Sequence, residues 1–211
     1  MSKEKIIIIG SGGHAKIILD ILEKINKYEI IGVVTEDTMD NFNGYPILGN
    51  DEVLSDLLKK DIKNVAMGIG GLRDNFLRKK IFEKVKKQGF NVISVIDPSA
   101  IISKSVSLGE GVVIFAGVVI NTGVFIGNNV IIATSSTIDH ETKVEDHVLI
   151  SAGVTIGAND LIQEGALLSL GSKVISGLKI GKNILVGAGA VVVSDCMDTG
   201  TYLGVPARKV E

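Results

Sequence analysis

An aliphatic residue occupies every sixth position over the C-terminal half of this chain, without a break. A sustained six-residue period predicts a parallel β-helix built of hexapeptide turns. Fifteen hexads separate the first and last of these positions, and three hexads make one triangular coil, so the repeat predicts about five coils. The sixteen positions are Ile102, Leu108, Ile114, Ile120, Ile126, Ile132, Ile138, Val144, Ile150, Ile156, Ile162, Leu168, Val174, Ile180, Val186 and Val192.

Glycine directly follows the aliphatic position in five hexads, which we interpret as corners that need unusual backbone angles. The unbroken period leaves no room for a long inserted loop, and the flat faces of a solenoid usually need covering. We therefore expect self-association, and a substrate pocket that uses the N-terminal domain, a neighbouring subunit, or both. The five glycines are Gly109, Gly127, Gly157, Gly181 and Gly187.

In the N-terminal half, the apolar residues follow the shorter periods of ordinary strands and helices. Four short apolar runs predict strands, and three amphipathic stretches predict helices. The runs lie at 6–9, 30–34, 65–67 and 92–96, and the stretches at 15–25, 51–60 and 75–88. Alternating strands and helices predict a small parallel sheet with Rossmann-like winding. Because the period changes just after Asp97-Pro98, the sequence predicts two domains, at 1–97 and 98–211.

Composition narrows the classes of function. A net charge of −2 does not predict nucleic-acid binding. The single cysteine, Cys196, excludes an intrachain disulfide framework, suits the cytosol, and is expected to be a small buried residue rather than a nucleophile. No apolar run approaches the roughly 18 residues of a membrane span, and the segment before the first strand is too short for a signal peptide. Three histidines without metal-ligand spacing give no support for a zinc site. We expect a cytoplasmic protein without membrane insertion.

The most reactive-looking stretch is Ser-Ser-Thr-Ile-Asp-His-Glu at 135–141. His140 stands two residues past an inward isoleucine, where the chain turns and side chains point outward. A near-neutral imidazole can take a proton from an amine or hydroxyl that attacks a thioester. A carboxylate at Glu141 or Asp139 could fix its tautomer and raise its basicity. The alternative is a surface histidine in a charged turn. For His147 the choice is between orienting a substrate and simple solvation.

The sequence Gly-Ser-Gly-Gly-His at 10–14 follows the first strand and opens the first helix. Backbone amides at such a place can hold a phosphate or another anion, helped by the helix dipole. Ala15 replaces the last glycine of a dinucleotide fingerprint, which argues against a dehydrogenase. A purely structural turn is the alternative.

Glu36 and Asp37 end the second strand, where they can meet a ribose or a base, or remain exposed loop carboxylates. At 203–209, a turn followed by Arg208 can meet the pantetheine arm and phosphates of coenzyme A, or form a basic tail.

Together these motifs resemble the bacterial sugar acyltransferases that include the sialic acid O-acetyltransferases and the UDP-amino-sugar N-acetyltransferases of bacillosamine synthesis. The resemblance covers nearly the whole chain. It implies a left-handed β-helix, a homotrimer, and acetyl-CoA in the groove between neighbouring β-helices. The motifs are Gly-Ser-Gly-Gly-His-Ala at 10–15, Gly-Tyr-Pro-Ile-Leu-Gly at 44–49, Pro-Ser-Ala at 98–100, Asp-His-Glu at 139–141 and Gly-Val-Pro-Ala at 204–207.

The resemblance also implies roles for single residues. His140 matches the general base of the family, and Glu141 matches its carboxylate partner. The residues expected to contact the sugar nucleotide are Gly12, Gly13, His14, Glu36, Asp37 and Gly68. Those expected to contact acetyl-CoA are His147, Leu149, Ala158, Leu170, Ala188 and Arg208. The chain departs from the family pattern at several of these positions, because Leu149 replaces a frequent histidine, Ala158 replaces a glycine, and Glu36 replaces an aspartate.

The sequence therefore predicts a Rossmann-like domain that binds a sugar nucleotide and a β-helix that binds acetyl-CoA and carries catalysis. We expect N-acetylation of a nucleotide-linked amino sugar in surface-glycan biosynthesis, with His140 as general base and no metal. Backbone amides near Ala158 are expected to stabilise the oxyanion. Two alternatives stay open: O-acetylation of a sialic acid or related sugar, and a non-catalytic scaffold or sugar-nucleotide sensor, which Leu149 keeps under consideration.

Overall fold

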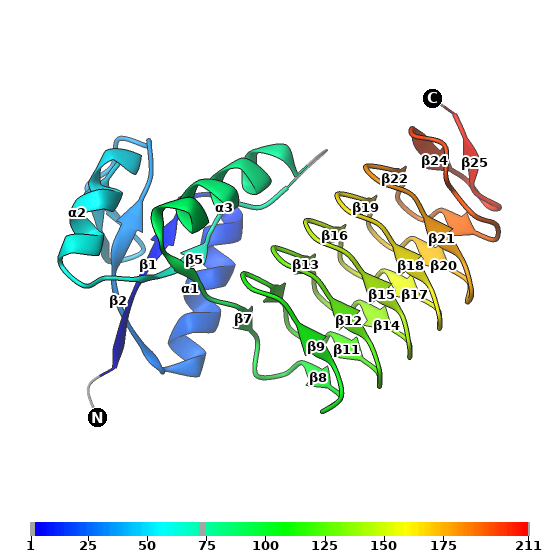
Figure 1. Ribbon diagram of the computed structural model, residues 1–211, viewed down its shortest axis with the longest axis horizontal. Helices are drawn as coiled ribbons and strands as arrows, with labels where there is room; N and C mark the ends of the chain where they lie inside the picture. The colour runs from blue at the N-terminus through cyan, green and yellow to red at the C-terminus, as the bar shows by residue number, and fades with distance from the viewer. Residues whose placement is uncertain (1–2, 72–74, 211) are drawn as a thin grey trace. The chain divides into compact units, whose positions relative to one another are not determined.

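The structure is a computed structural model that describes residues 3–71 and 75–210 (Figure 1). The described residues divide into two compact units: the first contains 3–71 and 76–98, and the second contains Asn75 and 99–210. The elements of the first unit are β1 (Glu4–Ile9), α1 (Gly13–Ile25), β2 (Tyr28–Val34), β3 (Asn41–Phe42), β4 (Tyr45–Gly49), a 3-10 turn η1 (Asp51–Val53), α2 (Leu54–Lys59), β5 (Asn64–Met67), α3 (Phe76–Gln88), β6 (Asn91–Val92) and β7 (Val95–Ile96).

Among the described residues, six strands of the first unit form one sheet in the order β3-β4-β2-β1-β5-β6. Only β3 and β4 pair antiparallel there. Ile6, Ile7, Ile8 and Ile9 of β1 are at most 3% exposed, because a central parallel strand is covered on both faces. The strand order reverses at β1. The carboxyl ends of β1 and β5 therefore border the topological switch point at which open α/β sheets bind ligands.

The Gly-Tyr-Pro sequence at 44–46 belongs to the β3–β4 hairpin. Two details of this unit differ from the expectation. The predicted helix at 51–60 divides into η1 and α2. The predicted strand at 92–96 is two short strands, because β6 pairs with β5 over only two residues before the chain leaves that sheet.

The second unit is a left-handed β-helix whose described strands, β8 to β23, each contain two residues. The strands are β8 (Ile101–Ile102), β9 (Ser107–Leu108), β10 (Val113–Ile114), β11 (Val119–Ile120), β12 (Phe125–Ile126), β13 (Ile131–Ile132), β14 (Thr137–Ile138), β15 (Lys143–Val144), β16 (Leu149–Ile150), β17 (Thr155–Ile156), β18 (Leu161–Ile162), β19 (Leu167–Leu168), β20 (Lys173–Val174), β21 (Lys179–Ile180), β22 (Leu185–Val186) and β23 (Val191–Val192). β24 (Thr201–Leu203) and β25 (Arg208–Lys209) follow.

The six-residue period closes into coils of eighteen residues. Ile120, Ile138 and Ile156 pair in register in parallel strands, and the other two faces of the coil repeat the pattern. Each predicted aliphatic position is the second residue of its strand, and those from Ile114 to Val192 are at most 3% exposed. The predicted fold class is confirmed. Cys196 is also buried as predicted, and burial raises the pKa of its thiol to about 11.

The interpretation of the corner glycines was wrong. The glycines directly after the aliphatic positions lack left-handed backbones; a Cβ on Gly109 would instead lie 2.7 Å from the Gly127 carbonyl carbon. Those glycines allow close approach of successive coils. The left-handed residue is the third one after each aliphatic position, and in the described chain this holds at every hexad from Gly111 to Gly189. Most of these residues are glycine or asparagine, but Ser135, Glu141 and His147 are not.

Candidate active site

The glycine loop at 10–14 joins β1 to α1 and leaves the start of that helix open. Gly12 is the N-cap of α1, and no side chain among the described residues caps it. A Cβ on Gly12 or Gly13 would meet no atom within 4 Å, so there is space in front of the helix. Because the first turn of α1 carries no acidic residue, its N–H groups and its dipole favour a bound anion.

Ser11 links this loop to the acidic segment after β2. Its hydroxyl is hydrogen-bonded to the Thr35 hydroxyl over 2.8 Å and to the Asp37 carboxylate. The Thr35 hydroxyl also accepts the backbone N–H of Asp37 at 3.2 Å. Glu36 and Asp37 are exposed. The structure therefore brings the predicted loop and the predicted acidic pair to one edge of the sheet, through a serine to which the sequence pattern assigned no role.

The segment after β5 packs against the same loop through two glycines. A Cβ on Gly68 would lie 2.7 Å from the Ile9 carbonyl oxygen, and a Cβ on Gly70 would lie 3.1 Å from the His14 Cβ. Gly68 is buried. Its immediate role is to let the β5 segment approach β1, while the predicted contact with a sugar nucleotide stays a prediction.

His14 lies mostly buried beside Arg78 of α3. Nη1 of Arg78 is 3.5 Å from His14 Nε2, and it donates to the carbonyl oxygens of Met67 and Ile69 at 3.1 Å and 2.5 Å. Burial, and then the positive charge of Arg78, lower the pKa of His14 to about 3. His14 is therefore neutral at pH 7, and it can meet a ligand by hydrogen bonding rather than by charge.

The sequence analysis missed Arg78, which lies in a stretch expected only to form an amphipathic helix. A cation in the first turn of a helix opposes the helix dipole, and the first turn of α3 contains no acidic residue. A positive charge in this unfavourable place was the signal in the sequence that could have marked Arg78 as a candidate site residue.

His140 lies at the corner between β14 and β15, with its side chain exposed. The Asp139 carboxylate accepts the Asn121 side-chain N–H at 2.8 Å and the backbone N–H of His140 at 2.7 Å. These hydrogen bonds, the Asn121 one first, lower the pKa of Asp139. Asp139 thus holds the backbone of the turn. Of the two carboxylates considered as partners of the imidazole, Glu141 is the one left for that role.

Glu141 has a left-handed backbone with φ of +58°. Its N–H donates to the Thr122 carbonyl oxygen at 3.1 Å. Its carboxylate lies over Gly123, in the preceding coil, where a Cβ would overlap it. In the part of the chain that the structure describes, no hydrogen bond joins this carboxylate to the His140 imidazole. The two side chains are neighbours whose pairing requires a rotamer change.

The residues expected to bind acetyl-CoA lie at different corners of the coil. Ala158 is one coil beyond His140 at the same corner. Leu170 and Ala188 are exposed and lie one coil apart at a second corner, and His147 lies at the third. One chain therefore does not bring the predicted cofactor residues together.

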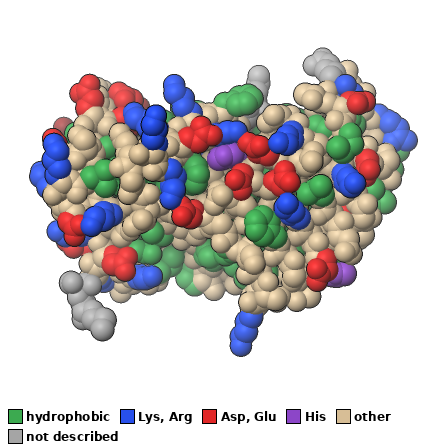
Figure 2. Space-filling view, in the orientation of Figure 1, with side chains coloured by type: hydrophobic (Ala, Val, Ile, Leu, Met, Phe, Trp, Pro, Cys, Tyr) green, Lys and Arg blue, Asp and Glu red, His purple; other side chains and the backbone are tan. Residues whose placement is uncertain are grey.

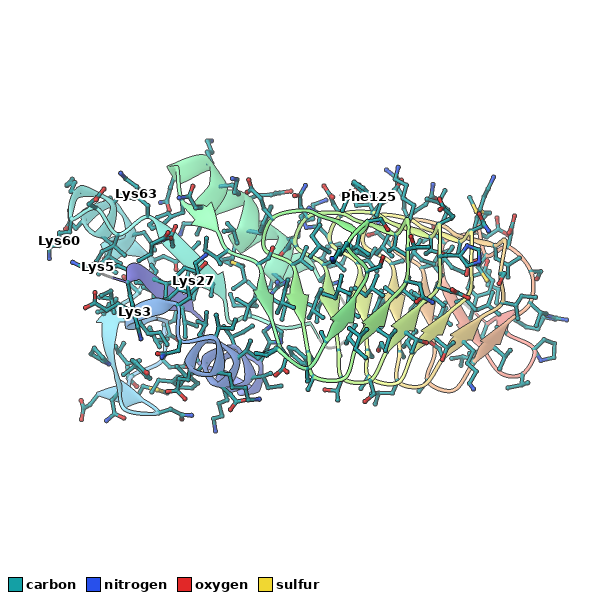
Figure 3. All side chains as sticks on the ribbon, turned by 90° about the horizontal axis from the view of Figure 1, so that it is seen from below. Lys3, Lys5, Lys27, Lys60, Lys63 and Phe125 are labelled. Atoms are coloured by element: carbon teal, nitrogen blue, oxygen red, sulfur yellow. The ribbon has the colours of Figure 1, made fainter. Side chains whose placement is uncertain are left out.

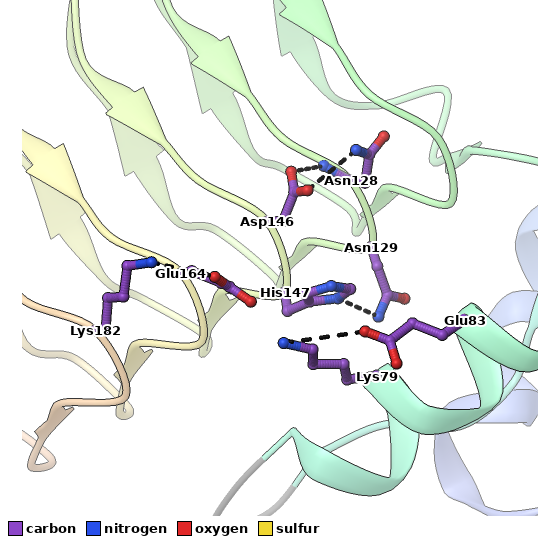
Figure 4. A network of polar contacts seen from close by, with 8 residues as sticks. All are labelled: Lys79, Glu83, Asn128, Asn129, Asp146, His147, Glu164 and Lys182. Atoms are coloured by element: carbon purple, nitrogen blue, oxygen red, sulfur yellow. Dashed lines mark hydrogen bonds and ion pairs between the residues drawn. The ribbon is translucent and has the colours of Figure 1, made fainter.

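Two of these residues already have partners inside the chain. The Ala158 amide donates to the Ser176 hydroxyl at 3.0 Å, so the predicted oxyanion donor is occupied. His147 is 6% exposed, and its Nδ1 lies 3.0 Å from Asn129 Nδ2 (Figure 4). His147 thus stabilises its corner, much as Asp146 does there by accepting two N–H groups of Asn128, at 2.7 and 3.2 Å.

The remaining predicted residues differ in exposure. Leu149 is 6% exposed on β16, so it offers little surface to a cofactor in the single chain. Arg208 is exposed on β25, and its Nη1 donates to the Ala207 carbonyl oxygen at 2.9 Å.

A shallow hollow of about 450 Å³ lies at the opposite end of the first unit's sheet, where the strands begin (Figure 3). Its lining mixes lysines with acids and amides, and Lys63 pairs with Asp61 at 2.5 Å. Since open α/β sheets bind ligands at the carboxyl ends of their strands, we place the candidate site at the glycine loop instead. The lining residues are Lys3, Glu4, Lys5, Lys60, Asp61, Lys63, Asn64 and Asn91.

Charge and hydropathy add two observations. On the face seen in Figure 2, acidic and basic side chains are intermingled, without the single-sign stripe typical of nucleic-acid binding. Over residues 3–71 and 75–210, no helix is long and apolar enough to cross a membrane, and no three metal-binding side chains converge.

The chain combines a left-handed β-helix, which carries an exposed histidine at one corner, with a Rossmann-like unit that has an open glycine loop, and sugar acyltransferases share this combination. A family model described as the PglD N-terminal domain matches residues 5–85. A mutant of GDP-perosamine N-acetyl transferase from Caulobacter crescentus, in complex with CoA and GDP-perosamine, is 34% identical with a TM-score of 0.90, over 98% of this chain and 97% of that chain. The acetyltransferase domain of PglB from Neisseria gonorrhoeae FA1090, in complex with acetyl coenzyme A, is 29% identical with a TM-score of 0.92, over 99% and 100%.

The chain belongs to the hexapeptide-repeat family of sugar N-acetyltransferases. It is an acyltransferase with acetyl-CoA as co-substrate. The predicted family and the predicted acyl transfer are confirmed. Between the amine and hydroxyl acceptors that the sequence left open, the family supports the amine.

Proposed function

We propose that this protein transfers the acetyl group of acetyl-CoA to the amine of a nucleotide-linked amino sugar, with His140 as general base. The observation that carries the proposal is the exposed imidazole at a corner whose backbone Asp139 holds by two hydrogen bonds. The Caulobacter relative supports it, because structures of that enzyme contain CoA and GDP-perosamine, and two of them carry a replaced histidine.

The first unit supplies the features that a nucleotide sugar needs. The open amino end of α1 suits a diphosphate, since backbone N–H groups there lack a side-chain acceptor among the described residues. The Asp37 carboxylate, held by Ser11, and the exposed Glu36 suit hydroxyl or N–H donors of a ribose or base. Neutral His14 adds a hydrogen-bonding group without a charge.

In the reaction, the sugar amine attacks the thioester carbonyl carbon of acetyl-CoA, and a C–N bond forms. His140 takes a proton from the amine nitrogen. The C–S bond then breaks, and the thiolate of coenzyme A leaves and takes up a proton. Glu141 supports the imidazolium that forms, once its carboxylate turns from Gly123 toward His140. No covalent acyl-enzyme is required.

The developing oxyanion needs a donor close to His140. The Ala158 amide lies one coil away at the same corner, and it is occupied by the Ser176 hydroxyl. We propose that the thioester oxygen displaces that hydroxyl when acetyl-CoA binds. The amide then stabilises the negative charge of the tetrahedral intermediate.

We infer that the enzyme works as a homotrimer. Ala158 lies at one corner of the β-helix, and Leu170 and Ala188 lie in successive coils at another corner. A single cofactor can therefore meet both corners only if a second chain supplies one of them. Leu170 is 62% exposed in the single chain, as expected of an apolar side chain that a neighbour covers. The cytoplasmic location and the surface-glycan role stay predictions.

The test is thiol release from acetyl-CoA in the presence of separate UDP-, GDP- and dTDP-linked amino sugars and of free or CMP-linked sialic acid. Turnover with one nucleotide amino sugar supports the proposal and identifies the substrate. Turnover only with sialic acids would reject the amine acceptor. Binding of acetyl-CoA without binding of any nucleotide sugar would reject the role of the first unit.

A further inference from the structure

Arg78 is a buried cation at the switch point of the first unit. It is 1% exposed, although arginine is rarely buried completely. A charge removed from water is costly unless hydrogen bonds or an opposite charge compensate it. Its guanidinium donates to the carbonyl oxygens of Met67, which ends β5, and of Ile69, two residues later. Arg78 thereby holds the backbone that leaves β5.

The same guanidinium faces the glycine loop. Its Nη1 is 3.5 Å from Nε2 of His14, the second residue of α1. His14 packs so closely against Gly70 that a Cβ there would lie 3.1 Å from the His14 Cβ and 3.3 Å from its Cγ. The loop after β1 and the segment after β5 therefore meet at His14, and Arg78 contacts both.

We propose that Arg78 is a positioning residue for nucleotide-sugar binding, which holds His14 and the segment after β5 in one arrangement so that the imidazole presents a fixed hydrogen-bonding edge. The inference rests on the proposed function of the glycine loop. Arg78 acts through His14 and does not itself contact the ligand.

The cation also contributes to the neutral state of His14. Burial is the first cause of the lowered pKa of His14, and the charge of Arg78 is the second. A histidine that became protonated would attract a diphosphate more strongly at acidic pH, and affinity would vary with pH. Beside Arg78 the imidazole stays neutral, so the affinity for the nucleotide sugar is expected to be constant between about pH 5.5 and pH 8.

The first experiment compares Arg78→Met, Arg78→Lys and the wild type by steady-state kinetics at several pH values. Arg78→Met is expected to raise KM for the nucleotide sugar about tenfold, the worth of one hydrogen-bonded contact to a charged group. That KM should stay independent of pH, because burial is the first cause of the lowered pKa of His14. KM for acetyl-CoA should stay within about twofold, because Arg78 has no part in cofactor binding. Arg78→Lys keeps the charge and part of the hydrogen bonding, so its KM for the nucleotide sugar should lie between those of the wild type and Arg78→Met.

Val85→Ala is the matched control, because Val85 is a fully buried residue of α3. It should lower the melting temperature without changing either KM. A double-mutant cycle with His14→Gln then separates positioning from general destabilisation. If Arg78 acts through His14, adding Arg78→Met to His14→Gln should raise the KM for the nucleotide sugar less than it does in the wild type.

The outcomes distinguish the two proposals. A wild-type protein that binds no nucleotide sugar would overturn both, and this is seen before any variant is compared. Wild-type binding with an unchanged KM in Arg78→Met, or with fully additive effects in the cycle, would overturn the role of Arg78 alone. A KM for acetyl-CoA that rises as much as the KM for the nucleotide sugar would show general destabilisation and would also overturn it.

Discussion

A Cβ on Gly123 would occupy the space that the Glu141 carboxylate fills. The two residues are eighteen positions apart, so they take the same place in successive coils. Both have left-handed backbones, with φ of +72° and +58°. A left-handed conformation costs a residue with a side chain roughly 1–2 kcal/mol, so the glutamate is kept here at the expense of stability. The missing side chain of Gly123 gives the carboxylate its room.

Gly123→Ala is therefore expected to displace the Glu141 carboxylate and to cost stability, while kcat stays within a few-fold, because the proposed role of Glu141 needs its carboxylate to leave Gly123. The control is Gly89→Ala, because Gly89 is also left-handed, with φ of +100°, and a Cβ there would meet no atom within 4 Å. Both variants should lose stability, and Gly123→Ala should lose more, because only its Cβ meets another side chain. Equal losses of unfolding free energy would contradict the contact between Gly123 and Glu141, and a large fall of kcat in Gly123→Ala would contradict the proposed turn of the carboxylate.

Replacement of His140 by alanine should lower kcat by about 10²–10⁴-fold, the usual contribution of a positioned general base. Thermal unfolding should change little, because the side chain is exposed. His147→Ala gives the contrast: it removes a buried side chain bonded to Asn129, so it should cost about 1–3 kcal/mol of unfolding free energy. Near-normal turnover of the His140→Ala variant would show that His140 is not the general base.

The lowered pKa of His14 predicts a pH-dependent stability. Its folded value of about 3 lies below the unfolded value of 6.5, so between these values the unfolded chain binds the proton and the folded chain does not. The neutral imidazole therefore contributes to the free energy of unfolding above pH 6.5. This contribution is lost as pH falls, and the loss is about 2 kcal/mol between pH 7 and pH 5. Urea unfolding of the wild type and of His14→Gln at both pH values measures it. If the difference in unfolding free energy between the two proteins were the same at both pH values, His14 would not be a buried neutral imidazole.

Ala158→Pro removes the Ala158 amide N–H at the start of a tight turn, and it is combined with Ser176→Ala because the proline ring would otherwise collide with the Ser176 hydroxyl. Loss of one oxyanion donor should lower kcat by about 10²–10³-fold. Ala116→Pro makes the same change at the equivalent place of an earlier corner, and it should leave kcat within a few-fold. Ser176→Ala frees the amide and should not raise KM for acetyl-CoA. A marked rise would mean that the hydroxyl itself binds the cofactor.

Sedimentation should show a trimer of the 22.3 kDa chain. Leu170→Asp places a charge on a side chain that we expect a neighbouring subunit to cover, so it should weaken the trimer and raise KM for acetyl-CoA together. A stable wild-type monomer with full activity would contradict a cofactor site that needs a second chain.

Much of the β-helix was determined by the sequence alone. The aliphatic period from Ile102 to Val192 specifies which side chains point inward, and eighteen-residue coils follow because parallel strands pair in register. Once the coil length is known, pairs such as Gly123 and Glu141 can be read as neighbours. His140 could likewise be placed outside, at a corner, from its distance to Ile138.

Only the tertiary structure decided which of those side chains are free to act. The Ala158 amide has a partner in Ser176, His147 is buried against Asn129, and Ser11 rather than a glycine connects the loop to Asp37. The periodic pattern reports which way a residue points, but not what its polar atoms meet. Arg78 and His14 are sixty-four positions apart in a unit without a repeat. No local pattern encodes such a contact, because it depends on how the fold brings Arg78 of α3 beside His14 and the end of β5.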